Sequence, residues 1–172
     1  MTKTDEECLE LAIRVAEDTF SKGNYPVGAV LAIDHEIVAS AGNEINTKKS
    51  YVNHAENFLI INNGVLIAEA YDQGKEISLY STLEPCIQCL GASVTNHINR
   101  IIYIQTDPNG GACNLKHDNI GLWYRETWPN IEQVPFSTKP KEMMINFFKQ
   151  EIKKGNIKWP TKMLGLLDTK DI

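Results

Sequence analysis

The stretch Ile77-Ser-Leu-Tyr-Ser-Thr-Leu-Glu-Pro-Cys-Ile-Gln-Cys89 passes from a short mixed run of apolar and hydroxyl residues into a turn and then to two cysteines. Residues 77–82 predict a strand. Proline is favoured near helix starts, and residues 86–96 therefore predict a helix that begins just after Pro85. The strand is thus expected to deliver both cysteines to the first turn of a helix.

Further strands and helices alternate on both sides of this unit. Apolar residues at helical spacing between Leu9 and Phe20 predict a helix, for which Thr4 and Glu7 supply a capping box. The remaining predicted elements are strands at 27–33, 37–41 and 100–105 and helices at 54–63, ended by Gly64, and 141–153. Strands divided by helices imply a parallel pair and a sheet covered on both faces. The predicted fold class is α/β, a three-layer α/β/α sandwich.

The size and composition are those of an ordinary globular protein, with 172 residues of which 42% are hydrophobic and 23% charged. We expect a single domain over residues 1–172, because two independent cores would be cramped. It includes a long irregular segment, 106–138, and a basic helical region, 139–172. No stretch approaches the roughly 20 apolar residues of a membrane span. The first residues are polar, so we expect a cytoplasmic protein without a membrane partner.

The net charge of −5 is unevenly distributed. Residues 1–138 carry 9 Lys and Arg against 18 Asp and Glu, whereas residues 139–172 carry 8 Lys against 4 Asp and Glu. An acidic body disfavours broad, non-specific binding of nucleic acid, which needs a basic face. The basic region keeps a local contact with nucleic acid open, although a solvated helix face is the simpler interpretation.

Two short motifs carry the chemistry: His54-Ala-Glu56, and a C-x-x-C pair formed by Cys86 and Cys89. One imidazole and two thiolates suit one zinc ion per chain. Three protein ligands leave a position for water, as in catalytic zinc sites. Glu56 is close enough to His54 to exchange protons with that water without binding the metal. The motifs therefore predict a zinc-dependent hydrolase.

A structural zinc and a thioredoxin-like dithiol are the alternatives for the C-x-x-C pair. A dithiol does not explain why His54 and Glu56 are present. A structural zinc needs a fourth protein ligand, and no other histidine has suitable spacing. Both alternatives are therefore disfavoured.

The pattern H-x-E followed by P-C-x-x-C resembles the cytidine deaminase-like superfamily, in the branch that contains tRNA adenosine deaminases and guanine deaminases. The similarity extends over most of residues 5–150, including Pro26-Val-Gly-Ala-Val30 and Asp107-Pro-Asn-Gly-Gly-Ala112. It implies a five-stranded mixed sheet and, usually, a homodimer. It also implies hydrolysis of a cyclic amidine, in which the exocyclic amine of a nucleobase becomes a carbonyl and ammonia is released.

The resemblance also implies roles for single residues. His54, Cys86 and Cys89 match the zinc ligands, and Glu56 matches the proton shuttle. The positions that match substrate-binding residues are Asn43, Val27, Gly28 and Ala29, which would otherwise be a turn residue and a buried strand. Glu84 and Pro85 precede the first cysteine and are expected to support the metal site, although Glu84 is equally a plain loop carboxylate. Candidates for a lid or pocket wall, or for anchors of the irregular segment, are Asp107, Trp123 and Tyr124.

The substrate stays open between two classes. The acidic body favours a small molecule containing guanine, adenine or cytosine, as a free base, nucleoside or nucleotide. A tRNA adenosine deaminase is the alternative, supported by the Leu83–Cys86 context and the basic region. It is disfavoured because Thr95 and His97 replace the His and Arg often found there, and because Asn57 replaces an apolar residue. A catalytically silent, zinc-stabilised interaction module is a remote third reading.

Overall fold

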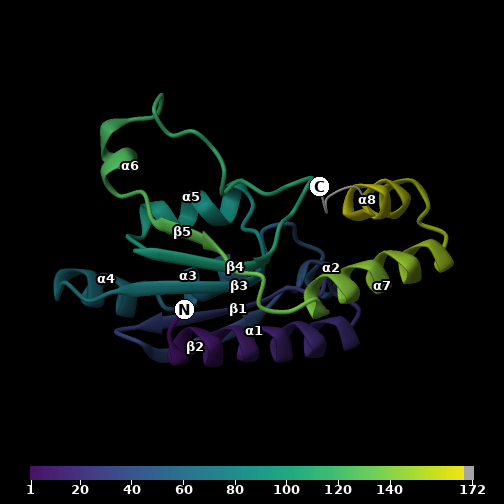
Figure 1. Cartoon of the computed structure of the whole chain (residues 1–172), viewed down its shortest axis with the longest axis horizontal. Helices are drawn as coiled ribbons and strands as arrows, with labels where there is room; N and C mark the ends of the chain where they lie inside the picture. Colours follow the sequence, from purple (N-terminus) through teal and green to yellow (C-terminus); the bar gives the residue numbers. More distant parts are fainter. Residues whose placement is uncertain (169–172) are drawn as a thin grey trace.

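The computed structural model describes residues 1–168 and forms a five-stranded mixed sheet in the order β2-β1-β3-β4-β5 (Figure 1). The strands are β1 (Gly28–Ile33), β2 (Glu36–Gly42), β3 (Ile77–Leu83), β4 (Arg100–Gln105) and β5 (Asn130–Gln133). The helices are α1 (Lys3–Ser21), α2 (Ile45–Lys48), α3 (Ala55–Asn62), α4 (Gly64–Asp72), α5 (Ile87–Thr95), α6 (Leu122–Glu126), α7 (Lys139–Lys153) and α8 (Lys158–Asp168). Strand β1 pairs antiparallel with β2 and β3, whereas β3, β4 and β5 run parallel.

Successive residues of each strand point to opposite faces of the sheet and pack in two separate cores. Val30, Tyr80 and Ile102 lie in the core that α1 covers. Their neighbours Leu31 and Leu79 lie in the core shared with α3, α5, α7 and α8. Because both faces are covered by helices, the predicted three-layer α/β/α fold is confirmed.

The parallel strands β3 and β4 end on the side of the molecule where α7 and α8 lie, while α6 lies at the opposite side (Figure 1). Ligand sites of parallel sheets lie outside the carboxyl ends of the strands. The side beneath α7 and α8 is therefore where a functional site is expected. Within the described residues, no helix is both long and apolar enough to cross a membrane.

The structure differs from the sequence predictions in four helices and one strand; the first is α2, which lies between the predicted elements at 37–41 and 54–63. Gly64 does not end a helical region but begins α4 directly after α3. Segment 106–138, predicted as irregular, contains α6 and the fifth strand, β5. Helix α8 in the basic region was not predicted. Each of these elements is short or depends on packing against a distant partner, which local periodicity does not register.

The predicted capping box at Thr4 and Glu7 is wrong. Thr2 is the N-cap of α1, and its hydroxyl accepts a hydrogen bond from the Asp5 N–H at 3.1 Å. The Thr2 N–H in turn donates to the Asp5 carboxylate at 2.7 Å. The pairs Thr2–Asp5 and Thr4–Glu7 have the same spacing in sequence. Contacts of Asp5 with residues distant in the sequence favour the Thr2–Asp5 pair.

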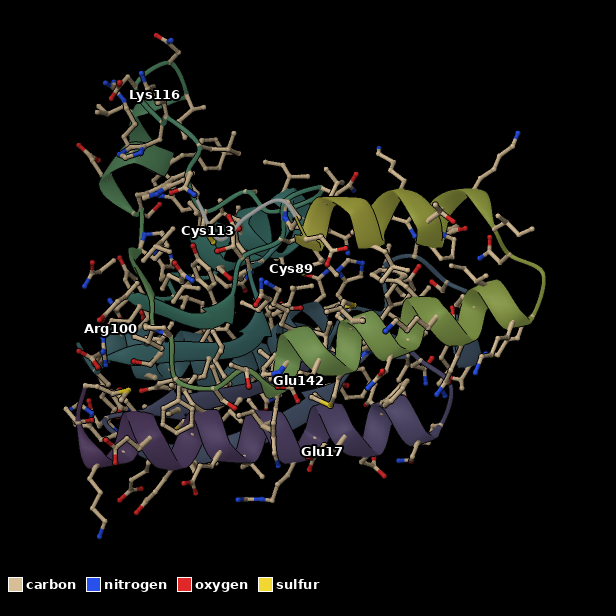
Figure 2. The ribbon with its side chains drawn as sticks, turned by 45° about the vertical axis from the view of Figure 1, so that its right-hand side comes forward. Glu17, Cys89, Arg100, Cys113, Lys116 and Glu142 are labelled. Carbon is tan, nitrogen blue, oxygen red and sulfur yellow. The ribbon has the colours of Figure 1, made fainter. Side chains whose placement is uncertain are left out.

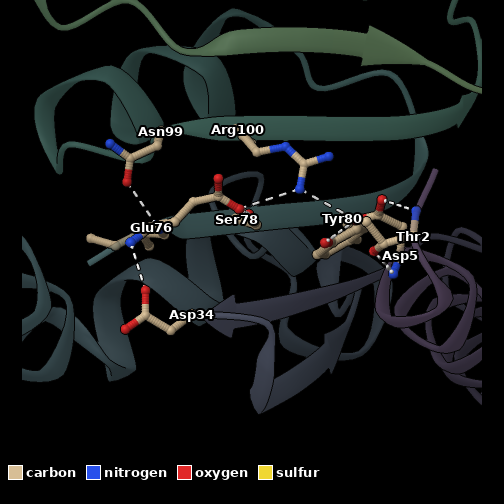
Figure 3. A network of polar contacts seen from close by, with 9 residues as sticks. Thr2, Asp5, Asp34, Glu76, Ser78, Tyr80, Asn99 and Arg100 are labelled. Carbon is tan, nitrogen blue, oxygen red and sulfur yellow. Dashed lines mark hydrogen bonds and ion pairs between the residues drawn. The ribbon is translucent and has the colours of Figure 1, made fainter.

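A buried polar network holds α1 against the amino-terminal part of β3 and β4 (Figure 3). The Asp5 carboxylate accepts hydrogen bonds from the Tyr80 hydroxyl at 2.6 Å and from the Arg100 guanidinium at 3.3 Å. Arg100 also pairs with Glu76 at 3.3 Å. Burial opposes ionisation of Asp5, but hydrogen bonds from Thr2, Tyr80 and Arg100 outweigh it and lower its pKa to about 2.

Candidate active site

Three metal-ligating side chains meet at the starts of two helices. His54 is the N-cap of α3 and Cys86 is the N-cap of α5. Cys89 lies in the first turn of α5 and is completely buried. Figure 2 shows Cys89 in the middle of the molecule, with Cys113 nearby and Lys116 far out on the projecting segment. The strand–turn–helix unit predicted from the sequence thus delivers both cysteines to one place.

The donor atoms fit a zinc ion. The Sγ atoms of Cys86 and Cys89 lie 3.6 and 3.5 Å from Nδ1 of His54, and 3.8 Å from each other. Tetrahedral zinc, with bonds of about 2.3 Å to sulfur and 2.0–2.1 Å to nitrogen, requires separations of about 3.8 Å between sulfurs and about 3.6 Å between sulfur and nitrogen. Among the described residues these three form the cluster able to hold a metal, so a tetrahedral ion would keep one position for water.

The charges at the cluster favour a cation. The hydrogen-bonded contact between the Cys86 and Cys89 sulfurs lowers the pKa of Cys86 to about 4, and contact with His54 adds to this effect against the cost of burial. The same bond to Cys86, together with burial and the nearby Glu56 carboxylate, raises the pKa of Cys89. The hydrogen bond between His54 and Cys86 raises the pKa of the His54 imidazole. The protons held among these groups are the ones that a bound dication displaces.

Glu56 is a buried carboxylate beside the cluster, with 3% of its surface exposed. The Ser81 hydroxyl donates to Oε1 of Glu56 at 2.9 Å, and the Cys89 thiol donates to Oε2 at 3.4 Å. Burial is the largest influence and raises the pKa of Glu56. A carboxyl group whose pKa is raised by burial is suited to accept and return a proton near neutral pH.

A cavity of about 780 Å³ opens above these groups. Of the predicted site residues, it is lined by His54, Glu56, Cys86, Asn43, Val27, Glu84 and Asp107. Further residues of the lining lie outside the sequence motifs; they include Tyr25, Lys49, Tyr51, Phe147, Glu151, Asn156 and Trp159. The structure therefore adds an aromatic and partly polar wall to the predicted metal centre.

Asn43 is fixed at the edge of this cavity. Its backbone N–H donates to the Val27 carbonyl at 2.9 Å, and its side-chain Oδ1 accepts from the Ile45 N–H at 3.0 Å. The side chain is only 4% exposed. With its oxygen engaged by the backbone, the amide group can present its nitrogen as a donor to a ligand.

Glu84 ties the loop after β4 to the metal site. One carboxylate oxygen accepts from the Asp107 N–H at 3.1 Å and the other from the Cys113 N–H at 3.0 Å. Glu84 is 4% exposed, and a side chain at Gly111 would overlap its carboxylate. Glu84 is therefore a buried strut between the end of β3 and the loop 107–113.

The same loop contacts the chain on each side of Cys86. Gly111 forms an isolated antiparallel bridge with Cys86, and the Ala112 N–H donates to the Pro85 carbonyl at 3.0 Å. The segment that carries the first cysteine is thus held between α5 and this loop.

Six predicted site residues lie outside the cavity lining, and two of them, Cys89 and Pro85, belong to the metal-site segment described above. Gly28 faces α1, where a side chain would overlap the Ala12 carbonyl, and Ala29 is completely buried in the core. Trp123 and Tyr124 belong to α6, with their rings in edge contact at 5.1 Å. Their contact with substrate stays a prediction.

The unpredicted cavity wall comes largely from the C-terminal region. Trp159 in α8 lines the cavity together with Phe147 of α7. A signal for α8 is present in the sequence, because Pro160 sits in its first turn and Met163 and Leu167 follow at helical spacing. What the sequence does not reveal is that this helix folds back over the carboxyl ends of β3 and β4.

Comparison with known proteins places this site in context. Residues 2–105 match the model of the cytidine and deoxycytidylate deaminase zinc-binding region. The tRNA-specific adenosine deaminase of Aquifex aeolicus is 34% identical over 148 residues, covering 84% of this chain and 94% of that protein. The Bacillus subtilis enzyme of the same name is 36% identical over 152 residues, covering 87% and 91%. A solved structure from a study of A-to-I editing by tRNA:A34 deaminases superimposes with a TM-score of 0.58 at 28% identity, covering 80% of this chain and 98% of that one.

Proposed function

The chain belongs to the cytidine and deoxycytidylate deaminase family, and we propose that within it the protein deaminates adenosine to inosine in tRNA. Membership makes it a deaminase, a hydrolase of C–N bonds. The observation that carries the reaction type is the position of Glu56, buried beside a cluster of three zinc-ligating atoms on a cavity floor. A catalytically silent zinc module has no need of such a carboxylate.

The chain's own groups account for binding the metal and moving the proton. His54, Cys86 and Cys89 would hold zinc, which when bound supplies a Lewis acid that makes water nucleophilic near neutral pH. Glu56 takes a proton from water as the water oxygen attacks the ring carbon. It then passes that proton to the ring nitrogen. Glu56 then transfers the proton of the new hydroxyl group to the exocyclic amine, the C–N bond breaks, and ammonia leaves as the carbonyl forms. The hydrogen bond from Ser81 orients Glu56 for these transfers.

Two observations support tRNA as the substrate. Curated relatives over more than four fifths of this chain are tRNA-specific adenosine deaminases. One lysine, Lys49, lines the cavity, and the Lys162 ammonium lies 5.6 Å from the ring centroid of Trp159, which is part of the lining. Such cations suit the phosphate backbone of a nucleic acid.

Deamination of a free base or nucleoside is the second candidate. The carboxylates of Glu56, Glu84, Asp107 and Glu151 line the cavity, against one lysine. A lining with this balance favours a neutral ligand over a polyphosphate. The excess of acidic residues over residues 1–138 likewise disfavours a nucleic acid.

A substrate screen separates the two candidates. The zinc-loaded protein is incubated with an RNA anticodon stem-loop carrying adenosine, and separately with cytosine, adenine and guanine as bases, nucleosides and nucleotides. Release of ammonia and formation of inosine in the stem-loop alone is the expected result. Turnover of a free base or nucleoside without turnover of the stem-loop contradicts the tRNA assignment. Metal analysis of the same preparation should find one zinc per chain, and freshly purified active protein without zinc refutes the metal assignment.

The exposed side of α3 and α4 supports assembly as a homodimer. Phe58, Ile61, Val65 and Leu66 are 44, 74, 76 and 40% exposed. A surface of neighbouring apolar side chains on two consecutive helices is typical of a protein interface. Light scattering should give twice the mass of the chain, and Ile61→Glu should reduce it to the mass of the monomer. A monomeric wild-type protein refutes this assembly.

A further inference from the structure

The catalytic cavity has more room than a single planar base requires. Its volume of about 780 Å³ falls within the range of about 300–1,000 Å³ in which pockets hold whole drug-sized ligands. The inner end contains the metal ligands and Glu56, and it is closed by Val27 and Asn43, which are 6 and 4% exposed. A base seated at this end leaves the outer end of the cavity unfilled.

Two exposed aromatic side chains wall the outer end. Tyr51 is 86% exposed and precedes His54 in the turn that leads to α3. Trp159 is 38% exposed and lies in α8, far from Tyr51 in the sequence. Both line the cavity. Large aromatic groups left in water beside a binding site are typical of surfaces that a ligand covers.

The Trp159 side of this wall is fixed before any ligand binds. Helix α8 is anchored in the core through Met163 and Leu167, which are 6 and 3% exposed. Trp159 shares the cavity wall with Tyr25, whose ring packs on Phe147 at 4.5 Å between centroids. Trp159 therefore presents a rigid surface, and little entropy is lost when a second ring stacks on it.

A lysine of the cavity lining supplies a cation for a phosphate. Lys49 lines the cavity and is exposed, with a backbone φ of 54°, a left-handed conformation that residues other than glycine rarely adopt. Aromatic faces combined with a lysine are the groups by which proteins bind single-stranded nucleic acid. The bases stack on the rings, and the cation pairs with the backbone.

We propose that Tyr51 and Trp159 form a stacking subsite for the nucleobase next to the target base in a single-stranded RNA loop. Lys49 pairs with the phosphate that connects the two nucleotides. This inference rests on the proposed function, because it takes the target base to be part of an RNA. A free base or nucleoside has no neighbour to occupy the subsite, so the subsite gives RNA an advantage that a small substrate does not have.

The test uses the zinc-loaded full chain with Glu56→Ala, which binds RNA without turnover. The probe is an RNA stem-loop with a fluorescent purine analogue on one or the other side of the target adenosine, because stacking on an aromatic side chain quenches its emission. Adding Tyr51→Ala should weaken binding about 10-fold and remove the quenching, whereas Tyr51→Phe should preserve both. Tyr71→Ala, which removes a tyrosine that is 47% exposed on α4, is the matched control and should change neither.

The outcomes separate the subsite from the proposed function. A probe that is not quenched on either side of the target overturns the subsite, whatever the enzyme deaminates. Unchanged binding in both Tyr51→Ala and Trp159→Leu overturns it as well, while tRNA deamination stands. If Tyr51→Ala turns a dimer into a monomer, Tyr51 is a subunit contact and the subsite is refuted. Quenching without conversion of adenosine in any RNA contradicts the proposed function alone.

The contribution of Lys49 is measured separately, through the salt dependence of RNA binding. Removing one phosphate contact to a single strand reduces the slope of log affinity against log salt concentration by about 0.7. Lys49→Gln should therefore flatten the salt dependence by that amount and leave the fluorescence quenching in place. An unchanged slope removes Lys49 from the subsite.

Discussion

The two ends of β3 and β4 each hold a buried carboxylate, and the two carboxylates titrate in opposite directions. Towards the amino ends, Asp5 is 2% exposed and its pKa is lowered to about 2 by Thr2, Tyr80 and Arg100. Towards the carboxyl ends, on the other face of the sheet, Glu56 is 3% exposed and burial raises its pKa. Burial is therefore the same at both ends, and the partners differ. A carboxylate whose partners outweigh the cost of burial stabilises the fold, whereas one for which burial remains the largest influence is available for proton transfer.

The strongest test of this contrast is Glu56→Gln, which keeps the shape of the side chain and removes its basicity. We expect turnover to fall about 10²–10⁴-fold, the usual contribution of a general acid–base group, because the amide accepts no proton. Zinc content and melting temperature should be retained, since Glu56 is not a ligand. Ammonia release, metal analysis and thermal unfolding measure the three quantities. Loss of zinc in this variant, or turnover within a few-fold of wild type, contradicts the assignment.

A smaller effect is expected for Glu84→Gln, at the same end of the sheet. The amide replaces an oxygen that accepts a backbone N–H with an NH₂ group, so one of the bonds to Asp107 and Cys113 is lost. The loop that bridges Cys86 loosens, and zinc affinity should fall about 10-fold, as for other groups that support metal ligands. Competition with a chelator measures the affinity. Glu132→Gln, at an exposed position of β5, is the matched control. Equal zinc affinity in the two variants contradicts the role of Glu84 in supporting the metal site.

The metal end of the sheet is the part that the sequence predicts best. Its ligands lie within two helix starts, and the spacing inside each motif is set by one helical turn. The relative position of Cys86 and Cys89 therefore follows from local sequence. The place of His54 and Glu56 beside them follows from the resemblance to the deaminase superfamily. The same holds for Asn43 and Val27, which the structure places at the cavity.

The rest of the cavity wall depends on contacts that local sequence does not encode. Strand β5 is mostly exposed and shows no apolar alternation, so only its pairing with β4 makes it a strand. Trp159 reaches the cavity because the chain turns back after α7 at Gly155, which has a φ of 95°. At the other end, two capping boxes were possible in sequence. Tyr80 and Arg100, which are far away along the chain, favour the box that contains Asp5.

The opposite end of the sheet gives the third test, Asp5→Asn. Because the folded pKa of Asp5 lies below the unfolded value of 3.8, its charge stabilises the fold above about pH 4 and is lost as the pH falls towards 2. The shift corresponds to about 2 kcal/mol at neutral pH. Urea unfolding should show that loss at pH 7 and a narrowing difference from wild type as the pH falls from 4 to about 2. Turnover per folded molecule should be unchanged; a large loss of turnover means that the two ends are coupled.

The smallest effect is expected for Glu17→Gln, which removes a carboxylate that is paired but exposed. Glu17 on α1 meets Lys139 on α7 at 3.1 Å, and the side chains are 46 and 60% exposed (Figure 2 labels Glu17). Water screens this pair and leaves both side chains mobile, so its removal should cost about 0.2–1 kcal/mol and less at high salt. Urea unfolding at low and high salt gives both values. A salt-independent loss of unfolding free energy as large as that of Asp5→Asn shows that a cation partner stabilises the fold even when the pair is exposed. The contrast between Asp5 and Glu56 then needs another cause.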